Sequence, residues 1–302
     1  MVLDELRDLI TRHARAGVTS TPEGVHVSLV EEAGPPATST TGTVLAVVAQ
    51  GAKRLALGDR VLEYRAGQHL VASLDLPVTG QFTEASRERP ALGFGLTLRP
   101  AVVAELLLHP TAREAAVLRH EPTAPPGIVV ADSSPALLDA VVRMLRLLDR
   151  PRDLPVLGPM VEREILWLLM TGEQGATVRQ LGLADSSLNH VGHAVTWLRE
   201  HYAEAVRVDD LAQIARMSPS ALHRSFRSVT AMSPIQFQKQ IRLQAARVRL
   251  VLDPRDVAGV AHAVGYESAS QFSREYRRQF GAPPAADALR LRATAGTAGA
   301  LG

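Results

Sequence analysis

The sequence predicts an α+β protein, in which an N-terminal antiparallel β-barrel with trailing helices precedes an all-α domain. Two observations support this fold class. Short β-rich runs punctuated by Gly and Pro occupy residues 25–98, and one helical pattern occurs twice in the C-terminal third. The chain has 302 residues, of which 46% are hydrophobic, so it is long enough for two domains with buried cores.

Six runs of alternating or β-branched residues are expected to form strands. They cover residues 25–30, 43–49, 54–57, 60–64, 69–73 and 92–98. Between the third and fourth runs, Leu57-Gly-Asp-Arg is typical of a tight hairpin. Many short strands with regular turns favour a small antiparallel barrel or sandwich, at about residues 20–98.

Amphipathic helices are expected after the barrel, at about residues 100–172. Ser134-Pro135 signals the start of one helix, and Pro159 is expected to begin another. Their apolar stripes predict packing against the barrel. Because Gly and small polar residues gather at 172–185, we place a first domain at 1–180 and a second at 187–290, which begins with a helix over 187–202. The Ala/Gly/Thr tail, 291–302, is expected to be disordered.

The repeated pattern is visible at a constant offset of 50 residues. Ser218 matches Ser268, Leu222 matches Phe272, Arg224 matches Arg274, Phe226 matches Tyr276, and Arg227 matches Arg277. A shorter apolar segment precedes each copy, at 211–215 and 260–264. Each copy therefore predicts a helix, a tight turn and a second helix. Ser218 and Ser268 stand at the N-cap positions of the second helices.

The second helices are expected to pack through one apolar stripe. Its members, the recognition-helix core, are Leu222, Phe226, Phe272, Tyr276 and Phe280. A long helix joins the two copies: it opens at Ser233-Pro234 and ends at Asp253-Pro254. Apolar residues at spacings of three and four predict a rigid spacer with one apolar face, which consists of Ile241, Ala245, Val248 and Leu252.

Two short helices with a tight turn, the second bearing exposed polar residues, are the helix-turn-helix plan. In that plan the second helix enters the DNA major groove, and two units can read successive turns roughly 34 Å apart. The charge distribution agrees with this interpretation. From Ser187 onward there are 15 Lys plus Arg against 9 Asp plus Glu, a balance of +6, while the rest has 18 against 22, or −4.

Residues 208–284 resemble the DNA-binding domain of the AraC/XylS family of bacterial transcription regulators. The resemblance includes the closing segment Val264-Gly-Tyr-Glu-Ser-Ala-Ser-Gln-Phe-Ser-Arg-Glu-Tyr-Arg-Arg-Gln-Phe-Gly-Ala-Pro-Pro. The family's first unit usually has Gly where this chain has Ala231, so Ala is strained there if the position needs φ > 0. Residues 51–70, followed by Asp75-Leu-Pro-Val, resemble the cupin-like N-terminal domain that accompanies a subset of these regulators.

The resemblance implies which residues would meet DNA. Its base-reading positions fall on Ser220, His223, Arg224, Ser270, Gln271 and Arg274. Arg can grip guanine with two bonds, Gln can read adenine, and Ser adapts to either. Arg227, Arg277 and Arg278 are better placed for phosphates, which set register without specifying sequence. Solvated surface charge is the commoner fate of an arginine, but the repeat favours a DNA role for Arg224 and Arg274.

A barrel mouth is a natural small-molecule pocket, so a small-molecule effector is one expected partner. The alternative is a barrel filled by its own side chains that serves only dimerisation or protein contacts. The expected partners are double-stranded DNA, RNA polymerase if the protein is an activator, and a second copy, because helices after the barrel often form the dimer interface in the resembling family. A protein that holds a partner through its basic domain is a rival interpretation.

An enzyme is not expected. A metal-dependent cupin would need clustered ligands, whereas His26 and His69 stand alone, so we expect no catalytic residues, metal or cofactor. A metabolic enzyme with a DNA-binding tail is the remaining alternative. The absence of Cys excludes disulfides and thiolate sites. A charged N-terminus and the lack of a membrane-length apolar run predict a cytoplasmic protein.

Overall fold

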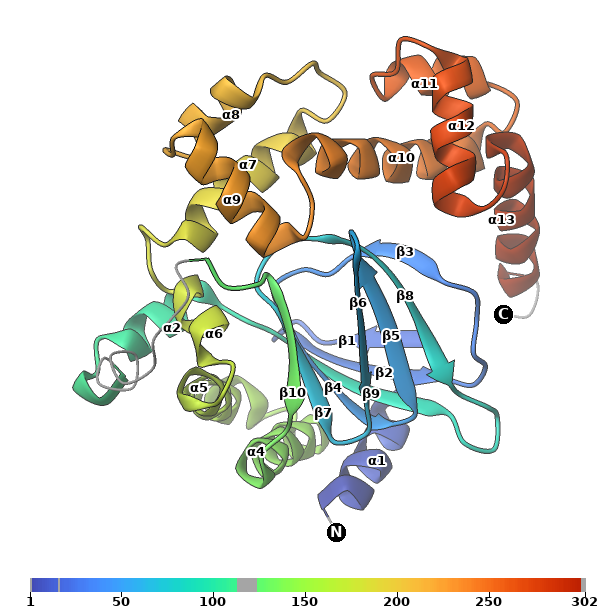
Figure 1. Ribbon diagram of the computed structural model, residues 1–302. Coiled ribbons are helices and arrows are strands. Elements are labelled where there is room, and N and C mark those ends of the chain that lie inside the picture. Colours follow the sequence, from blue (N-terminus) through green and yellow to red (C-terminus); the bar gives the residue numbers. More distant parts are fainter. Residues whose placement is uncertain (1, 16, 113–123, 300–302) are drawn as a thin grey trace. The chain divides into compact units, whose positions relative to one another are not determined.

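The computed structural model describes residues 2–15, 17–112 and 124–299 (Figure 1). The chain divides into two compact units. One comprises Met1–Gly192 with Arg224–Met232, and the other His193–His223 with Ser233–Gly302. None of the described helices is long and apolar enough to cross a membrane.

The first unit contains two antiparallel sheets. The six-stranded sheet has the order β1-β2-β9-β4-β7-β10, formed by Gly17–Ser20, Val25–Val30, Ala91–Thr97, Val44–Gln50, Gln68–Ala72 and Ile128–Asp132. The four-stranded sheet has the order β3-β8-β5-β6, formed by Ala37–Thr40, Pro77–Glu84, Ala52–Leu57 and Arg60–Arg65. This confirms the antiparallel β domain that the sequence predicts, with its strands divided between two sheets.

All six predicted runs form strands, and the predicted hairpin is present. Leu57 pairs with Arg60, and Gly58 between them has φ 59°, a left-handed conformation that glycine adopts without strain. Strands β1, β3, β8 and β10 were not predicted. The last of these follows helix α2, Pro100–Leu107, in the chain and pairs with β7 at the edge of the larger sheet.

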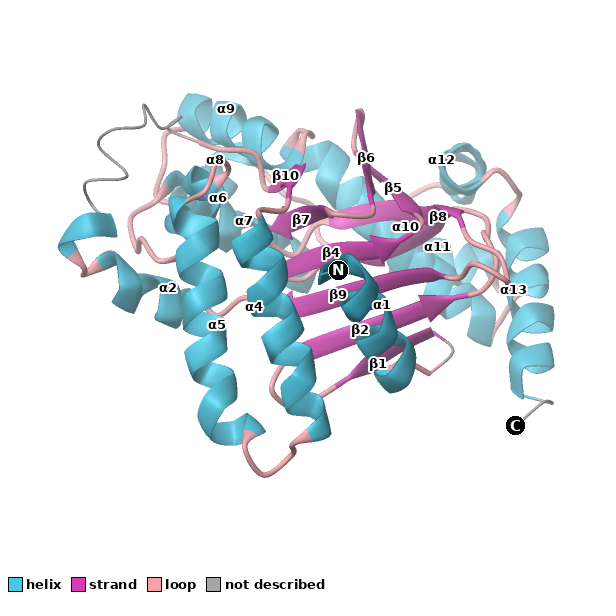
Figure 2. Ribbon diagram, turned by 90° about the horizontal axis from the view of Figure 1, so that it is seen from below, coloured by secondary structure: helices cyan, strands magenta, loops and turns pink. Residues whose placement is uncertain are grey.

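Helices cover one face of the six-stranded sheet (Figure 2). The first, α1 (Val2–His13), packs against β2, β4 and β9 and buries Leu6, Leu9 and Ile10. Helix α4 (Pro135–Arg146) packs beside α1, and its N-cap is Ser134, whose side chain accepts a hydrogen bond from Leu137 N, as its position before Pro135 predicts. The apolar faces of these helices thereby close the outer side of the sheet.

Helix α5 corrects one sequence prediction. It runs from Leu154 to Thr171, so Pro159 lies inside the helix, and Pro155 is the proline of its first turn. A proline in the first turn lacks only an N–H that has no helical partner, whereas Pro159 removes one internal hydrogen bond that the rest of the long helix compensates. The segment expected to be a loop boundary, 172–185, holds a further helix, α6 (Gly175–Leu181).

The remaining helices include those that the sequence predicts, which are a first helix and then two helix-turn-helix units joined by a long helix, and they end with one helix that was not predicted. They are α7 (Ser187–Glu200), α8 (Val208–Ile214), α9 (Pro219–Thr230), α10 (Pro234–Leu252), α11 (Val257–Ala263), α12 (Ala269–Phe280) and α13 (Pro284–Gly299). Helix α10 begins with a capping box formed by Ser233 and Gln236. Because α13 continues to Gly299, the predicted disordered tail is helical over 291–299; residues 300–302 lie outside the described residues.

The predicted apolar face of α10 is only partly the face that packs, because Ala245 of that set lies against the core of the neighbouring helices. Val248 and Leu252 are 69% and 77% exposed, and the helix instead buries Phe237, Leu243, Ala246 and Leu250. Leu243, Ala246 and Leu250 join a core with residues of α11, α12 and α13, which include Val260, Val264, Phe272, Tyr276 and Ala288. The sequence contains two apolar stripes of helical period, and the packing of the three neighbouring helices selects the second one.

Candidate nucleic-acid interface

Helices α9 and α12, called here the reader helices, begin in the same way. The Ser218 side chain accepts a hydrogen bond from Ala221 N at 3.3 Å, and the Ser268 side chain accepts one from Gln271 N at 3.3 Å. Each serine satisfies a backbone N–H that the first helical turn would otherwise leave unpaired. The N-caps expected from the repeat are therefore present in both copies.

One stripe of each reader helix is buried. Leu222 and Phe226 of α9, and Phe272 and Tyr276 of α12, are 0% exposed, while Phe280 is half-buried. In α12 the rings contact in series, with centroid distances of 5.5 Å from Phe272 to Tyr276 and 4.6 Å from Tyr276 to Phe280. Tilted ring pairs at these distances are favourable beyond the area they bury. The aromatic stripe therefore holds α12 firmly against its neighbours.

The polar residues predicted to meet DNA lie on the exposed parts of the reader helices. All nine are exposed: Ser220, His223, Arg224, Arg227, Ser270, Gln271, Arg274, Arg277 and Arg278. None of the five arginines in this set forms an ion pair with a residue that the structure describes. Their guanidinium groups are thus available to an external partner. Gln271 differs, because its side chain donates a hydrogen bond to Glu275 at 3.2 Å.

Glu275 is an acidic residue on α12 that sequence reasoning missed. Its carboxylate lies 2.9 Å from the ammonium of Lys239 on α10 and accepts a hydrogen bond from Tyr266 Oη at 2.9 Å. Burial alone would raise the pKa of Glu275, but the hydrogen bonds from Lys239, Gln271 and Tyr266 lower it below its ordinary value. The negative charge is therefore compensated internally, and it joins α12 to α10.

Arg242 of α10 is a second residue that sequence reasoning missed. Its guanidinium donates to the carbonyls of Tyr202, Glu204 and Gly265 at 2.6, 2.9 and 2.8 Å. Gln238, one turn earlier, donates to the Tyr202 and Glu204 carbonyls as well, at 3.1 and 2.7 Å. The loop before α8 and the turn before α12 are thus fastened to the same helix. Polar residues on a helix of mixed composition give no sequence signal of this role.

An open groove of about 560 Å³ lies beside this cluster. The loop residues Ala203 and Val206, the α10 residues Lys239 and Arg242, and Gln271 of α12 line parts of it. The groove therefore borders one of the predicted base-reading positions.

Asp287 anchors α13 and was also missed. It is 0% exposed, yet its carboxylate accepts hydrogen bonds from Arg247 at 2.8 Å, Tyr276 at 2.9 Å and Arg290 at 2.6 Å. Burial alone would raise the pKa of Asp287, but these three donors lower it below its ordinary value. The buried charge connects α10, α12 and α13, so it supports the second reader helix from behind.

The expected strain at Ala231 is present. Ala231 has φ 57°, a left-handed conformation, and Gly281 at the equivalent place after α12 has φ 76°. The turn between the two helices of each unit shows the same difference. Arg216 has φ 52° in the first copy, and Gly265 has φ 87° at the equivalent position of the second. The first copy therefore holds two non-glycine residues in conformations that favour glycine.

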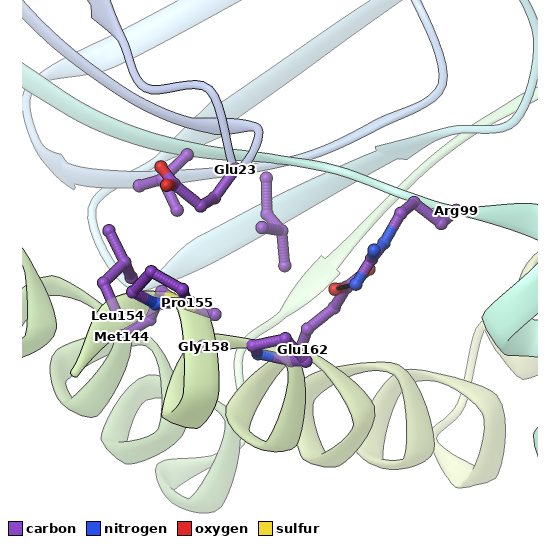
Figure 3. Close-up of a pocket in the computed structure, with 10 residues that line it drawn as sticks. Glu23, Arg99, Met144, Leu154, Pro155, Gly158 and Glu162 are labelled. Atoms are coloured by element: carbon purple, nitrogen blue, oxygen red, sulfur yellow. Dashed lines mark hydrogen bonds and ion pairs between the residues drawn. The ribbon is translucent and has the colours of Figure 1, made fainter. Parts of the chain in front are cut away.

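Two cavities in the first unit lie where helices cover the six-stranded sheet. The smaller, of about 100 Å³, has Val25 and Leu96 of the sheet on one side and Gly158 of α5 on another. Figure 3 shows Arg99 and Glu162 reaching toward each other at its edge. Arg99 Nε donates to Glu162 Oε1 at 2.7 Å, so these two charged groups of the cavity satisfy each other. The larger cavity, of about 270 Å³, is lined in part by His69.

The two histidines considered as metal ligands are separate. His26 on β2 lies within hydrogen-bond distance of Ser20 and Thr97, whereas His69 on β7 contacts Ser133. Over residues 2–15, 17–112 and 124–299, no group of three or more His, Cys, Asp or Glu side chains is placed to hold a metal ion.

Two family models match the chain. Residues 22–177, more than half of it, match the model described as the AraC-type transcriptional regulator N-terminus, and residues 211–288 match a helix-turn-helix domain. The first match covers both sheets from β2 onward, and the second extends from α8 into α13.

Similar curated proteins are transcriptional activators. The HTH-type transcriptional activator RhaS of Escherichia fergusonii is 31% identical over 130 residues, which are 42% of this chain and 46% of that protein. RhaS of Salmonella schwarzengrund is 26% identical over 152 residues, which are 49% of this chain and 53% of that protein. The chain thus spans about half the length of the curated relatives it matches.

Among solved structures, ToxT from Vibrio cholerae has a similar fold. Its unsaturated fatty acid-bound form matches 86% of this chain and 92% of that chain, with a TM-score of 0.52 and 9% identity. A second ToxT structure, bound to a naphthalenyl butenoic acid, has a TM-score of 0.53 and 8% identity, and the match covers 88% of this chain and 98% of that one. At this identity the likeness concerns the fold alone.

Proposed function

Because this chain belongs to the AraC-type transcriptional regulators, we propose that its two reader helices enter successive major-groove segments of one operator. The observation that supports this most directly is the equivalence of Arg224 and Arg274. Each is exposed on the helix whose opposite stripe is buried, and neither is paired with another described residue. An arginine in that setting is free to grip a guanine edge with two hydrogen bonds.

The roles of the remaining residues follow from their chemistry. Ser220, His223 and Arg224 would contact bases from α9, and Ser270, Gln271 and Arg274 would do so from α12. The exposed arginines Arg227, Arg277 and Arg278 would contact phosphates. Residues 187–290 would form the DNA-reading domain, and residues 1–180 an effector-sensing or dimerisation domain.

Selection of bound sequences from random double-stranded DNA, repeated at several salt concentrations, tests the proposal. We expect two conserved half-sites about 10 base pairs apart, one for each reader helix. The full chain with Arg292→Ala is the matched control, because Arg292 is exposed on α13, outside the reader helices. If the full chain selects no sequence above the random background, the proposal is wrong.

We further propose that the first domain binds a small-molecule effector and that the protein acts in the cytoplasm as a homodimer. The ToxT structures with bound acids support the effector, and the RhaS relatives support an activator. As an activator, the protein would contact RNA polymerase. We assign no catalytic role, because the relatives are transcription regulators.

A further inference from the structure

The larger cavity of the first unit, called here the His69 cavity, lies between one edge of the six-stranded sheet and the helices that cover it. Side chains two residues apart on a strand share a face, and both His69 and Val71 of β7 line the cavity. Leu137 of α4, Leu168 of α5 and Val178 of α6 supply further walls. Its 270 Å³ correspond to about nine water molecules, which is enough room for a small organic molecule.

His69 gives the cavity a polar group in an otherwise largely apolar wall. The side chain is 6% exposed, and Nδ1 lies 3.2 Å from Ser133 Oγ. Within the described residues, Nε2 has no hydrogen-bond partner. Burial lowers the pKa of His69 to about 4, although Asp132 works against this shift, so the ring is neutral at physiological pH. Nε2 is not fully shielded from solvent, so a ligand in the cavity can form a hydrogen bond with it.

Among the described residues that line the His69 cavity, the carboxylates are the charged groups. Asp132, at the end of β10, and Glu173, after α5, are its two charged residues, and both are exposed. Asp132 accepts one hydrogen bond, from Gln68 at 2.9 Å. None of the described residues that line the cavity is Lys or Arg. With His69 neutral, two carboxylates beside an apolar wall attract a cation and repel an anion.

We propose that the His69 cavity binds a small organic ammonium ion with an apolar body. The ammonium group would lie at Asp132 and Glu173, the apolar body would contact Val71, Leu137 and Leu168, and a polar atom of the ligand would complete the hydrogen bonding of His69. This ligand differs in charge from the acids bound in the ToxT structures.

The His69 cavity also touches the turn between the last two helices of the proposed first domain. Gly172, Glu173 and Gln174, the turn between α5 and α6, line it. Arg179, only 2% exposed, donates to the Met170 carbonyl across this turn. The turn and α6 are therefore packed together tightly. A ligand that displaces Glu173 would also displace α6. We infer that the cation changes the affinity of the protein for its operator, an inference that rests on the proposed function.

Calorimetry on the full chain with three matched probes tests the binding. We expect 2-phenylethylamine to bind, 2-phenylethanol to bind roughly tenfold more weakly, and phenylacetate to bind more weakly still. The double variant Asp132→Asn/Glu173→Gln should lose roughly tenfold in affinity for the amine and little for the alcohol. Glu88→Gln, which removes an exposed carboxylate elsewhere in the first unit, should change neither.

A second variant addresses the cavity itself. Leu168→Trp should fill it and abolish binding of both the amine and the alcohol, with circular dichroism confirming that the variant is folded. Equal binding of the three probes, no binding of the amine, or an amine affinity unchanged in the double variant would each overturn the proposed site. An amine that binds without altering operator affinity would overturn only the regulatory part. A chain that binds the amine but lacks DNA sequence preference would overturn the proposed function and leave the site intact.

Discussion

Ala231 and Gly281 end the two reader helices with the same backbone geometry. Their φ angles are 57° and 76°, and each donates its N–H to a carbonyl four residues earlier, Ala231 to Arg227 at 2.9 Å and Gly281 to Arg277 at 2.8 Å. A left-handed residue is a common way to end a helix, and glycine adopts it without the clash that a Cβ atom introduces. Both reader helices therefore end in a left-handed residue, but only the second has glycine at that position.

Replacing Gly281 by Ala should lower the free energy of unfolding by about 1 kcal/mol. A methyl group there would have no atom within 4 Å, so the loss comes from the backbone conformation alone. Urea unfolding of the full chain measures this loss of stability. Gly34→Ala is the control, because Gly34 also faces open space but lacks a positive φ. This control substitution should leave stability nearly unchanged. The converse change, Ala231→Gly, should raise stability by roughly 0.5 kcal/mol, less than the full strain because a buried methyl group is lost. A destabilised Ala231→Gly protein would contradict this account.

Gly265→Ala should be more damaging than Gly281→Ala. Gly265 has φ 87°, and an added Cβ would overlap the Ala203 carbonyl, so the cost includes steric displacement of the loop before α8. We expect a loss of about 2–4 kcal/mol in unfolding free energy. Arg216→Gly at the equivalent turn should instead stabilise the protein by up to about 1 kcal/mol. Equal losses in Gly265→Ala and Gly281→Ala would show that the close approach to Ala203 is unimportant.

Arg242→Ala should destabilise the protein by about 2–3 kcal/mol, because four backbone carbonyls lose a charged donor. Arg242→Lys should rescue little, since an ammonium cannot reproduce the planar donor geometry. If the proposed function holds, Arg242→Ala should also tolerate altered spacing between half-sites, which gel-shift titration against a spacing series would reveal. Arg249→Ala is the control, because Arg249 makes one exposed hydrogen bond to Tyr202 Oη.

Asp287→Asn should reduce stability at neutral pH by about 2–3 kcal/mol, because the positive charges of Arg247 and Arg290 lose their buried counter-charge. The folded-state pKa of Asp287 is lowered below its ordinary value of 3.8. Its contribution is therefore fully present above pH 3.8 and is lost as the pH falls through the lower folded pKa. Unfolding free energies measured across that acid range should converge for wild type and Asp287→Asn. A difference that stays constant down to the lowest pH would show that the carboxylate charge is not responsible.

Arg224→Ala and Arg274→Ala should each cost about 1–3 kcal/mol at the cognate operator and relax specificity at one base position. Competition binding against single-base operator variants would locate that position. Arg227→Ala should weaken binding to all sequences alike and reduce the salt slope by about one unit. Equal losses on every sequence for the first two variants would refute base reading, and a loss confined to one site would refute the phosphate role of Arg227.

Local signals in the sequence determined much of the second half of the protein. The offset of 50 residues, the N-caps Ser218 and Ser268, and Pro234 with Asp253 at the ends of α10 predicted the order of helices and turns. The strain at Ala231 was foreseen for the same reason, since φ at a helix end depends on the residue and its nearest neighbours. In the first half, alternation predicted six strands, while short or isolated strands such as β1 and β10 gave no periodic signal.

Only the tertiary structure decided which of two apolar stripes on α10 is buried. Val248 and Leu250 are equally apolar in sequence, yet one is 69% exposed and the other 0%, because α11, α12 and α13 pack on one side of the helix. The charged contacts of Arg242 and Asp287, and the cavity beside His69, likewise depend on segments far apart in the chain. Sequence periodicity predicts that a helix has an apolar face. Contacts between segments far apart in the chain determine which residues pack against that face and which polar groups become buried.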